Sequence, residues 1–520
     1  MNVSILSGGS ESGLFGERSL LAGLVLAGLA GGCQLFTGPA DPEPGARPNV
    51  VIIVADDLGY GDIGANGSEV IATPNIDGLA REGVRLTDGY VSAAVCSPTR
   101  AGLFTGRYQN RFGYEYNPTN NYVSGPDSEL GLPEGQTTLG DLMRGAGYVT
   151  GLVGKWHLGA LEQYHPLNRG FDEFFGHLGG GTSYFDGPTA DAVSWPGPII
   201  RGRESPRDVR EILDGFEVVK VEEYLTDAFA DRAVDFIERH ASKPFFLMLT
   251  PNAPHTPIQA TTEYVDRNLH IEREGARIFA AMVSAVDDMV GHVVDALRRN
   301  SIERNTLVVF LSDNGCINYV SDAICTNSPL SGAKRYHLEG GVRVPFLLQW
   351  PDGLPQGAVY EHPVISLDLY ATLGAVAGVD ESALDGRDGV NLIPYLRSEA
   401  EGPPHEFLFW RSAPNRSVRW GNWKLWKVDR TDLEESALQG GRLLPNVEYP
   451  PVSAHGQLTV LHDLSTDVGE QVNLASDHPD IVERLEAELD AWNATLAEPM
   501  WTSRRSTVDR LHGEMVQLYF

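Results

Sequence analysis

The sequence predicts an α/β protein: a large domain with a central, mostly parallel or mixed sheet flanked by helices, followed by a small domain with an antiparallel sheet and a helix. Three observations lead to this prediction. Between residues 48 and 400, apolar β-branched runs alternate with helical patterns. Polar side chains follow directly after those runs. Beyond residue 400, short strand-like pieces joined by turns precede one helix. Such a change of pattern is typical of a layered α/β domain with a smaller unit appended.

The length and charge of the chain limit the class of protein. Its 520 residues suffice to bury a large core and to form more than one domain. The 40 Lys and Arg residues are outnumbered by 70 Asp and Glu residues, which gives a formal net charge of −30. No basic stretch interrupts this excess, so the sequence argues against a nucleic-acid partner. An anionic substrate would need a locally positive pocket.

Residues 1–33 are predicted to be a signal peptide of the lipoprotein type, followed by a linker over residues 34–47 that is rich in Pro and Gly. Arg18 precedes an apolar run that is too short to span a bilayer. Ala30-Gly31-Gly32-Cys33 resembles a bacterial lipoprotein cleavage box, in which Cys33 is lipidated. An ordinary secretory signal with an incidental cysteine is the alternative. Both interpretations predict export to the periplasm or cell surface, and lipidation would add membrane anchorage, as in an outer-membrane lipoprotein.

Cysteine is rare in this chain, with four residues, which is too few for a disulfide scaffold. Apart from Cys33 and Cys96, the chain contains Cys316 and Cys325. Export would permit a disulfide between these two residues, closing a short loop. Two free thiols are the alternative.

The large domain is predicted over residues 48–400. Four apolar runs indicate buried strands, at residues 48–55, 148–154, 245–249 and 306–311. Capping residues or apolar residues at helical spacing indicate helices at residues 73–79, 138–146, 222–240 and 273–298. Residues 160–220 are rich in Gly, Pro and aromatic residues and are expected to form loops and insertions.

The pattern beyond residue 400 predicts a small antiparallel domain over residues 401–500 and a tail over residues 501–520. Strand-like pieces joined by turns cover residues 407–410, 417–420, 423–426 and 458–461. A helix is indicated at residues 479–496.

Polar residues follow the predicted strands of the large domain at the points where the strands end. These residues are Asp56, Asp57, Lys155, His157, His255, Asp313 and Asn314. Ligands of open α/β sheets bind at the carboxyl ends of the strands. We therefore expect these side chains to converge on one pocket.

Four of these residues, Asp56, Asp57, Asp313 and Asn314, offer only oxygen ligands. Oxygen-only sets suit hard cations and not Zn²⁺. Ca²⁺ is favoured over Mg²⁺ because it tolerates an irregular cage made of protein groups. For adjacent acids taken alone, a capping role at the start of a loop is the alternative.

Cys96-Ser97-Pro98-Thr99-Arg100 is predicted to be a loop that enters a helix, because proline is tolerated in a first helical turn. The positive end of that helix, together with Arg100, suits an anion or oxyanion close to Cys96. A small buried cysteine is the alternative.

Further groups that counterbalance the carboxylates are Lys155, His157, His255 and Lys334. Clustered in one pocket, these side chains would hold a tetrahedral oxyanion and transfer protons.

These residues resemble the motifs of a known family, the type I sulfatases of the alkaline-phosphatase superfamily, which includes arylsulfatases and carbohydrate sulfatases. Residues 96–100 match the family's Cys-x-Pro-x-Arg signature, with Thr99 where serine is more usual. The other landmarks occur in the family's order: Gly154-Lys155-Trp156-His157-Leu158-Gly159, Pro254-His255-x-Pro257, Ser312-Asp313-Asn314-Gly315 and the string from Lys334 to Pro345. The resemblance covers residues 48–400 and implies an alkaline-phosphatase-like fold.

The resemblance also implies how Cys96 functions. In the family this cysteine is oxidised by a separate maturation enzyme to formylglycine, whose aldehyde hydrates to a diol. A thiol would form a stable thiosulfate ester, whereas the diol can attack sulfur and then expel sulfate. Asp56, Asp57, Asp313, Asn314 and the modified Cys96 are implied as the metal ligands. The metal lowers the pKa of the diol, and Asp313 takes the proton of the attacking hydroxyl.

The remaining roles follow from the same resemblance. Lys155 and Lys334 are implied to hold the sulfate oxygens. His255, together with Lys334, is implied to bind the substrate and protonate the leaving alcohol. His157 is implied to deprotonate the second hydroxyl so that sulfate is released, and Arg100 to hold the diol in place.

The substrate implied is a sulfated carbohydrate, such as a polysaccharide fragment, or an aryl sulfate. A phosphonate or phosphate diester hydrolase with the same formylglycine is the nearest alternative, because sulfate and phosphate are both tetrahedral. A third interpretation is a surface lipoprotein that binds sulfated glycans without turnover.

Overall fold

The computed structural model describes residues 47–118, 129–187, 189–195, 211–317, 324–431, 456–503 and 506–520. Two further short strands are placed as backbone, β18 (Leu438–Gln439) and β19 (Arg442–Leu443). The predicted signal peptide and linker, with Cys33, lie outside the described residues.

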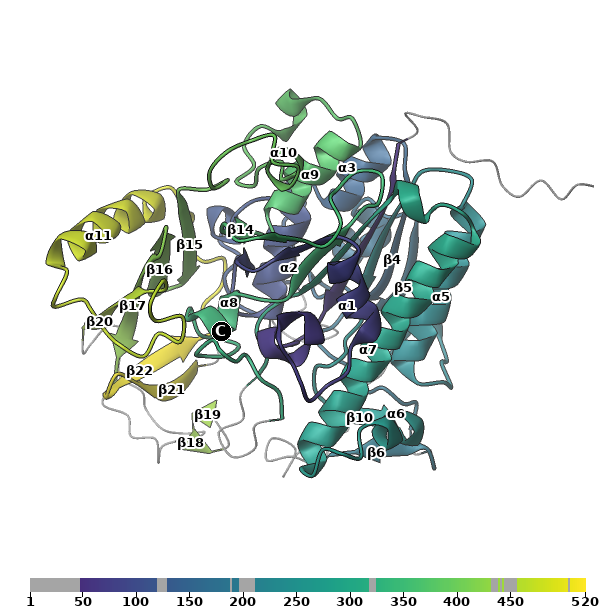
Figure 1. Ribbon diagram of the computed structural model, residues 1–520, viewed down its shortest axis with the longest axis horizontal. Helices are drawn as coiled ribbons and strands as arrows, with labels where there is room; N and C mark the ends of the chain where they lie inside the picture. Colours follow the sequence, from purple (N-terminus) through teal and green to yellow (C-terminus); the bar gives the residue numbers. More distant parts are fainter. Residues whose placement is uncertain are drawn as a thin grey trace, which may run out of the picture. The chain divides into compact units, whose positions relative to one another are not determined.

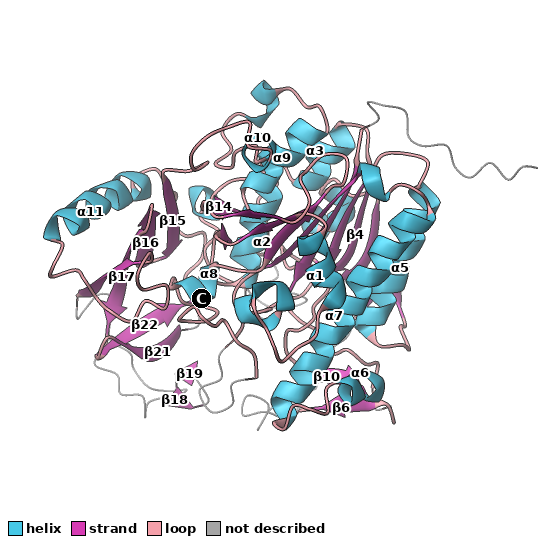
Figure 2. Cartoon of the chain, in the orientation of Figure 1, coloured by secondary structure: helices cyan, strands magenta, loops and turns pink. Residues whose placement is uncertain are grey.

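A ten-stranded sheet forms the centre of the large domain, with the strand order β13-β2-β12-β11-β1-β9-β4-β5-β7-β8 (Figures 1 and 2). Five central strands are parallel: β11 (Thr306–Ser312), β1 (Asn49–Ala55), β9 (Phe245–Thr250), β4 (Val149–Lys155) and β5 (Glu173–His177). The outer strands include antiparallel pairs and are shorter: β12 (Phe346–Gln349), β2 (Val84–Leu86), β13 (Ala358–Tyr360), β7 (Ile212–Asp214) and β8 (Glu217–Val219). The predicted mixed, mostly parallel sheet is confirmed.

Helices cover both faces of this sheet. The long helices α5 (Leu225–His240) and α7 (Glu274–Arg299) pack with each other and share one core cluster. The second cluster includes side chains of α2 (Cys96–Thr105), α3 (Leu139–Gly145) and α9 (Asp368–Val376). Successive residues of β1 belong to the two clusters in turn, so the strand is buried on both sides. This double burial explains its continuous apolar sequence.

The remaining helices and two small strand pairs of the large domain lie outside the ten-stranded sheet. The helices are α1 (Pro74–Arg81), α6 (Thr262–Arg267), α8 (Glu339–Val342) and α10 (Ile393–Leu396). Two strand pairs lie outside the large sheet: β3 (Gly89–Tyr90) with β14 (Val364–Ile365), and β6 (Ala192–Ser194) with β10 (Gln259–Thr261).

Residues 160–220, which the sequence assigns to loops and insertions, supply four strands instead. β5, β7 and β8 extend the large sheet, and β6 pairs with β10. Three of these four strands have three residues each. Such short segments carry too little apolar periodicity to be recognised, and long-range pairing rather than local sequence defines them.

The small domain is a six-stranded antiparallel sheet with one long helix. Its strands are β15 (Phe407–Ser412), β16 (Asn415–Trp420), β17 (Trp423–Arg430), β20 (Gln457–Asp463), β21 (Ser506–Leu511) and β22 (Glu514–Tyr519). Helix α11 (Pro479–Asn493) packs Leu485 and Leu489 into a cluster with Leu408 and Trp410 of β15. The tail predicted from residue 501 therefore belongs to this sheet, because β22 pairs with β17.

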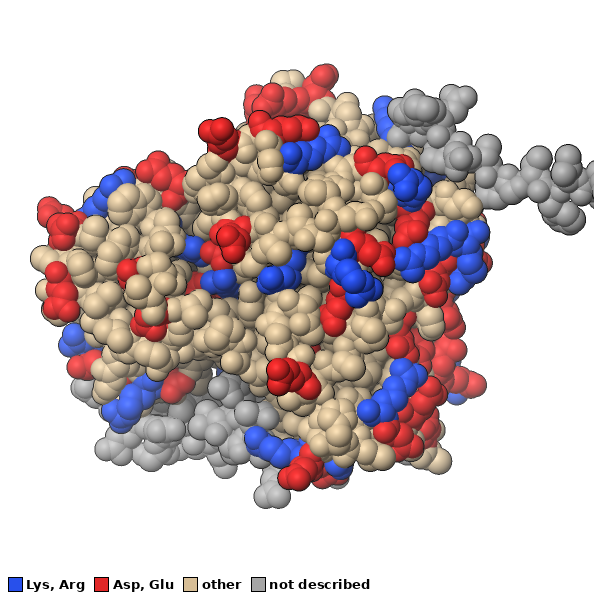
Figure 3. All heavy atoms as spheres, viewed as in Figure 1, with Lys and Arg blue, Asp and Glu red and all other residues tan. Residues whose placement is uncertain are grey.

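The visible surface carries acidic and basic side chains interspersed, with acidic side chains densest at the right of the view (Figure 3). Among the described residues, no helix is both long and apolar enough to cross a membrane.

Candidate active site

Polar residues converge where the parallel strands end, as the sequence predicts. Strands β1 and β11 run in register to their last residues, so Asp56 and Asp313 leave the sheet side by side. The Asp313 amide donates to the Ala55 carbonyl at 3.0 Å, and the Asp56 amide donates to the Ala253 carbonyl at 3.1 Å. These backbone bonds place the ends of β1, β9 and β11 against one another.

Helix α2 brings Cys96 to the same place. All ten of its residues are buried. The Ser97 amide donates to Asn117 Oδ1 at 2.9 Å, and the Ser97 hydroxyl donates to the His157 carbonyl at 2.6 Å. The first turn of the helix is therefore tied to two neighbouring segments. Because first-turn amides lack partners within a helix, such external acceptors fix its direction.

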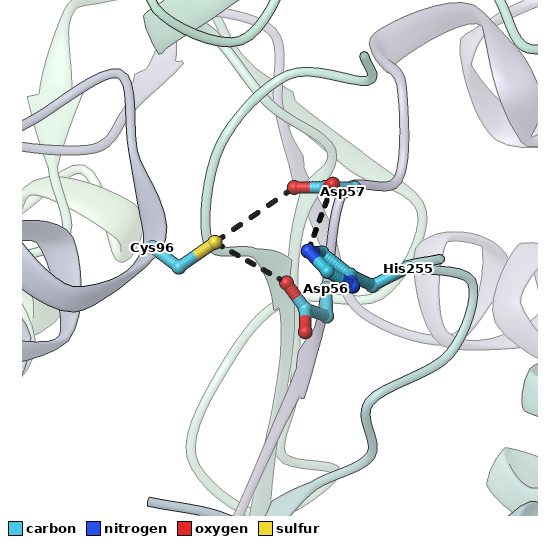
Figure 4. A group of neighbouring side chains, drawn as sticks. All are labelled: Asp56, Asp57, Cys96 and His255. Carbon is cyan, nitrogen blue, oxygen red and sulfur yellow. Dashed lines mark hydrogen bonds and ion pairs between the residues drawn. The ribbon is translucent and has the colours of Figure 1, made fainter. Parts of the chain in front are cut away.

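Cys96 faces the two aspartates that follow β1 (Figure 4). Its Sγ lies 3.5 Å from Asp56 Oδ1 and 3.9 Å from Asp57 Oδ1. His255 Nε2 lies 3.7 Å from Asp57 Oδ2 on the same side. Asp57 also has a left-handed backbone with φ of 65°. A non-glycine residue in this region costs about 1–3 kcal/mol and is a feature of functional sites.

Two lysines neutralise these aspartates. Lys155 Nζ lies 2.6 Å from Asp56 Oδ2, and Lys334 Nζ lies 2.6 Å from Asp57 Oδ1. Lys334 Nζ also contacts Cys96 Sγ at 2.9 Å. Burial alone would lower the pKa of Lys334, but the charge of Asp57 and the neighbouring acids raise it above its usual value. Lys334 therefore keeps its proton in the site.

Arg100 and Asp313 form a fully buried ion pair. Arg100 donates from Nε and one terminal nitrogen to Asp313 Oδ2 at 3.1 and 2.9 Å, and from the other to the Lys155 carbonyl at 2.8 Å. Burial raises the pKa of Asp313, and the charge of Asp56 adds to that effect. Burial also raises the pKa of Asp57, but the charge of Lys334 and the hydrogen bonds from Lys334 and Asn314 outweigh it and hold that pKa below its usual value.

Two histidines complete the pocket. His255 Nδ1 bonds to the Thr256 carbonyl at 2.7 Å, which leaves Nε2 facing Asp57. Burial lowers the pKa of His255 to about 3, so the ring is neutral. Burial also lowers the pKa of His157, with a further contribution from the charge of Lys155. A Cβ atom on Gly180 would lie 2.6 Å from His157 Nε2, so the backbone there can approach the ring only because residue 180 is glycine.

The donor set of this pocket fits a hard cation. One ligand atom from each of Asp56, Asp57, Cys96 and His255 lies within 4.8 Å of the others. Asp57 Oδ2 and Asn314 Oδ1 are buried and accept no hydrogen bond among the described residues. The Asn314 amide nitrogen donates to Asp57 Oδ1 at 2.7 Å, which fixes the side chain. Buried oxygens without a donor are the groups that a bound cation would satisfy.

The contacts and charge interactions above bring together the ten residues predicted for the site. Nine of them are buried, and His255 is partly buried, with its side chain 20% exposed. The ten are Asp56, Asp57, Cys96, Arg100, Lys155, His157, His255, Asp313, Asn314 and Lys334. The structure also joins Cys316 to Cys325 in a disulfide. Cys96 is the one free cysteine among the described residues.

Three further residues of this site, His177, Asn117 and Gly180, are not predicted from the sequence. His177 ends β5 opposite Lys155 and is buried, and burial lowers its pKa, as do the charges of Lys155 and Arg100. Asn117 accepts a hydrogen bond from the Ser97 amide, and the backbone of Gly180 lies against the His157 ring. His177 is the last residue of β5, a strand within the stretch that the sequence assigns to loops, so the sequence does not reveal its position at a strand end.

The encoded thiol is poorly suited to act as a nucleophile. Cys96 is 1% exposed, and burial raises the pKa of its thiol to about 12 despite the nearby lysines. At pH 8 roughly one molecule in ten thousand would carry the reactive thiolate. We expect iodoacetamide to label Cys96 in unfolded but not in native unconverted protein, as measured by mass spectrometry. Rapid labelling of the native protein would contradict this assignment.

The pocket combines an oxygen-rich candidate cation site with two lysines, an arginine and two histidines, an arrangement suited to the hydrolysis of a tetrahedral anionic ester. A family model described as Sulfatase matches residues 48–379. This chain belongs to the sulfatase family and is a sulfuric ester hydrolase.

Known sulfatases are similar to this chain over most of its length. Mouse steryl-sulfatase is 33% identical over 557 residues, covering 92% of this chain and 87% of that protein. Human N-acetylgalactosamine-6-sulfatase is 31% identical over 445 residues, covering 84% and 82%. The crystal structure of Ps i-CgsB in complex with k-i-k-neocarrahexaose has a TM-score of 0.74 and 33% identity, covering 88% of this chain and 95% of that one.

Proposed function

We propose that this sulfatase removes sulfate from a sulfated carbohydrate, such as a polysaccharide fragment, and that its nucleophile is hydrated formylglycine made from Cys96. The observation that best supports this proposal is the position of Cys96 Sγ, which contacts Lys334 Nζ at 2.9 Å and Asp56 Oδ1 at 3.5 Å. Because burial raises the pKa of this thiol, it is protonated at neutral pH. A residue in this position requires chemical conversion to act at neutral pH. The partner implied is a formylglycine-generating maturation enzyme.

The residues around the nucleophile support this role. Lys155 and Lys334 are the cations that would hold the sulfate oxygens. His255 Nε2 is unprotonated in the neutral ring, because Nδ1 is bonded to a carbonyl. His255, together with Lys334, would protonate the leaving alcohol, and the proton reaches Nε2 only once substrate is bound. His157 would take the second proton of the hydrated formylglycine, and Arg100 holds Asp313 in place.

We further propose that the cation is Ca²⁺, with Mg²⁺ less favoured, held by Asp56, Asp57, Asp313, Asn314 and the modified residue 96. The unpartnered oxygens of Asp57 and Asn314 support this assignment. A bound divalent ion supplies Lewis-acid stabilisation and lowers the pKa of the nucleophile.

Removing the ion is expected to lower kcat by about 10²–10⁴-fold, since such an ion contributes several kcal/mol to the transition state. The measurement is turnover of an aryl sulfate after chelation, with Ca²⁺ or Mg²⁺ added back. Ca²⁺ should also raise the melting temperature of the chelated protein. Full activity without any divalent ion would contradict the assignment.

The substrate class rests on likeness to Ps i-CgsB, whose crystal structure was solved in complex with k-i-k-neocarrahexaose. We expect sulfate release from defined sulfated oligosaccharides and at least about tenfold higher kcat/KM for an aryl sulfate than for the matching aryl phosphate or phosphonate diester. The reverse preference would favour a phosphate or phosphonate diester hydrolase. Hydrolysis of aryl or steryl sulfates without release from any carbohydrate would contradict the substrate proposal.

The cellular location of the protein and its domain boundaries are also proposals. We infer export to the periplasm or cell surface through a signal peptide over residues 1–33, with lipid on Cys33, and a linker over residues 34–47. We place the catalytic domain at 48–400 and the small domain from 401 onward. Labelling with a radioactive fatty acid, compared between the natural chain and Cys33→Ser, tests the anchor.

A further inference from the structure

A buried charged network connects the small domain to the short helix α8. Glu339, the first residue of α8, is fully buried. Lys424 of β17 donates to Glu339 Oε1 at 2.7 Å and lies 3.4 Å from Glu470 Oε1. The Glu339 amide donates to Glu470 Oε2 at 2.6 Å. The small domain therefore holds both the side chain and the backbone of Glu339.

The same carboxylate also reaches the large domain. Tyr90 of β3 donates its hydroxyl to Glu339 Oε2 at 2.6 Å, and Arg343 donates to that oxygen at 3.2 Å. Arg343 and Arg419 both pair with Asp88 next to β3. These charges are nearly excluded from water. In such a buried environment, the energy of each ion pair depends strongly on its geometry.

The backbone of α8 contacts three segments that carry residues of the active site. The Gly315 amide, directly after Asn314, donates to the Gly341 carbonyl at 3.1 Å. The Val91 amide, on the segment leading to Cys96, donates to the Val342 carbonyl at 2.9 Å. The Gly340 amide donates to the carbonyl of Ser331 at 2.7 Å, close before Lys334.

The packing around α8 leaves no free space for adjustment. A Cβ atom on Gly315 would lie 1.7 Å from the Gly340 carbonyl oxygen. A Cβ atom on Gly341 would lie 2.0 Å from the Tyr336 carbonyl oxygen. A shift of α8 would therefore be transmitted to the neighbouring segments, because closely packed elements move together.

We propose that Lys424 is a positioning residue: through Glu339 it fixes α8, and α8 fixes the segments that bear Cys96, Asn314 and Lys334. The small domain is thus required for turnover through its contacts with α8. This inference rests on the site roles given under the proposed function. Lys424 itself is 1% exposed and contacts Glu339 and Glu470.

The test compares Lys424→Met with Lys427→Met in the full chain. Lys427 lies on the same strand but pairs with Glu486 nearer the surface, so it is a matched control. With 4-nitrophenyl sulfate, at a temperature well below each melting point, Lys424→Met is expected to lose about 100-fold in kcat, the size of loss expected for a displacement of about 1 Å. Its KM should change less than about threefold, and Lys427→Met should retain kcat within about twofold.

A folded Lys424→Met variant with a lowered melting temperature but unchanged kcat would overturn the proposal, since Lys424 would then act on stability alone. If Lys424→Met does not fold, Glu339→Gln decides by the same criterion, because it removes the charge that pairs with Lys424 while keeping the size of the side chain and an acceptor oxygen. Absence of turnover in the unsubstituted, converted protein would instead contradict the proposed function.

Discussion

Replacing Cys96 by alanine is expected to lower kcat for sulfate ester hydrolysis by at least about 10⁴-fold, because loss of a nucleophile removes the covalent route that the other residues serve. The melting temperature should change little, since Cys96 contributes one small buried side chain. The measurement is steady-state turnover of an aryl sulfate together with thermal denaturation.

The control for this variant is the unsubstituted chain produced without a maturation enzyme. That protein retains the thiol, whose pKa burial raises to about 12, and it should be as inactive as Cys96→Ala. Turnover by either protein at more than a few per cent of the converted enzyme would show that the lysines and histidines suffice without a nucleophile at this position.

The second large expected effect is a loss of folding stability when Arg100 is replaced. Arg100→Met should lower the free energy of unfolding by about 3–5 kcal/mol, because it leaves the Asp313 carboxylate buried without its cation. The loss is measured by denaturant unfolding at neutral pH. Turnover should fall as well, since Asp313 is a proposed metal ligand.

Arg239→Met is the matched control for Arg100→Met. Arg239 pairs with Glu173 at 2.7 Å, but its side chain is 41% exposed. Solvent screening limits such a pair to about 0–1 kcal/mol. Equal destabilisation by the two substitutions would contradict the importance assigned to the buried pair.

The strands that could be predicted from the sequence are those buried on both faces, because burial requires a continuous run of apolar residues. β1 and β11 are buried on both faces, and their apolar runs identify them without further information. β7 and β8 have three residues each and gain their structure from pairing partners distant in sequence. The sequence assigns the hairpin of β21 and β22 to a tail, because its place in the small domain depends on the pairing of β22 with the distant strand β17.

The site was predictable to the extent that it follows strand ends. Asp56 and Asp313 come directly after parallel strands and Lys155 ends another, and the common direction of these strands brings them together. Lys334 follows no strand, and its position was indicated by a motif rather than by topology. The contact between Lys424 and Glu339 joins residues 85 positions apart, and no local pattern reveals it.

The central claim is that Cys96 is the precursor of the nucleophile. Mass spectrometry of the tryptic peptide spanning residues 86–100, after co-expression with a formylglycine-generating enzyme, tests it most directly. We predict an aldehyde in place of the thiol, with specific activity proportional to the converted fraction across preparations. Fully active protein in which this peptide retains its thiol would contradict the account.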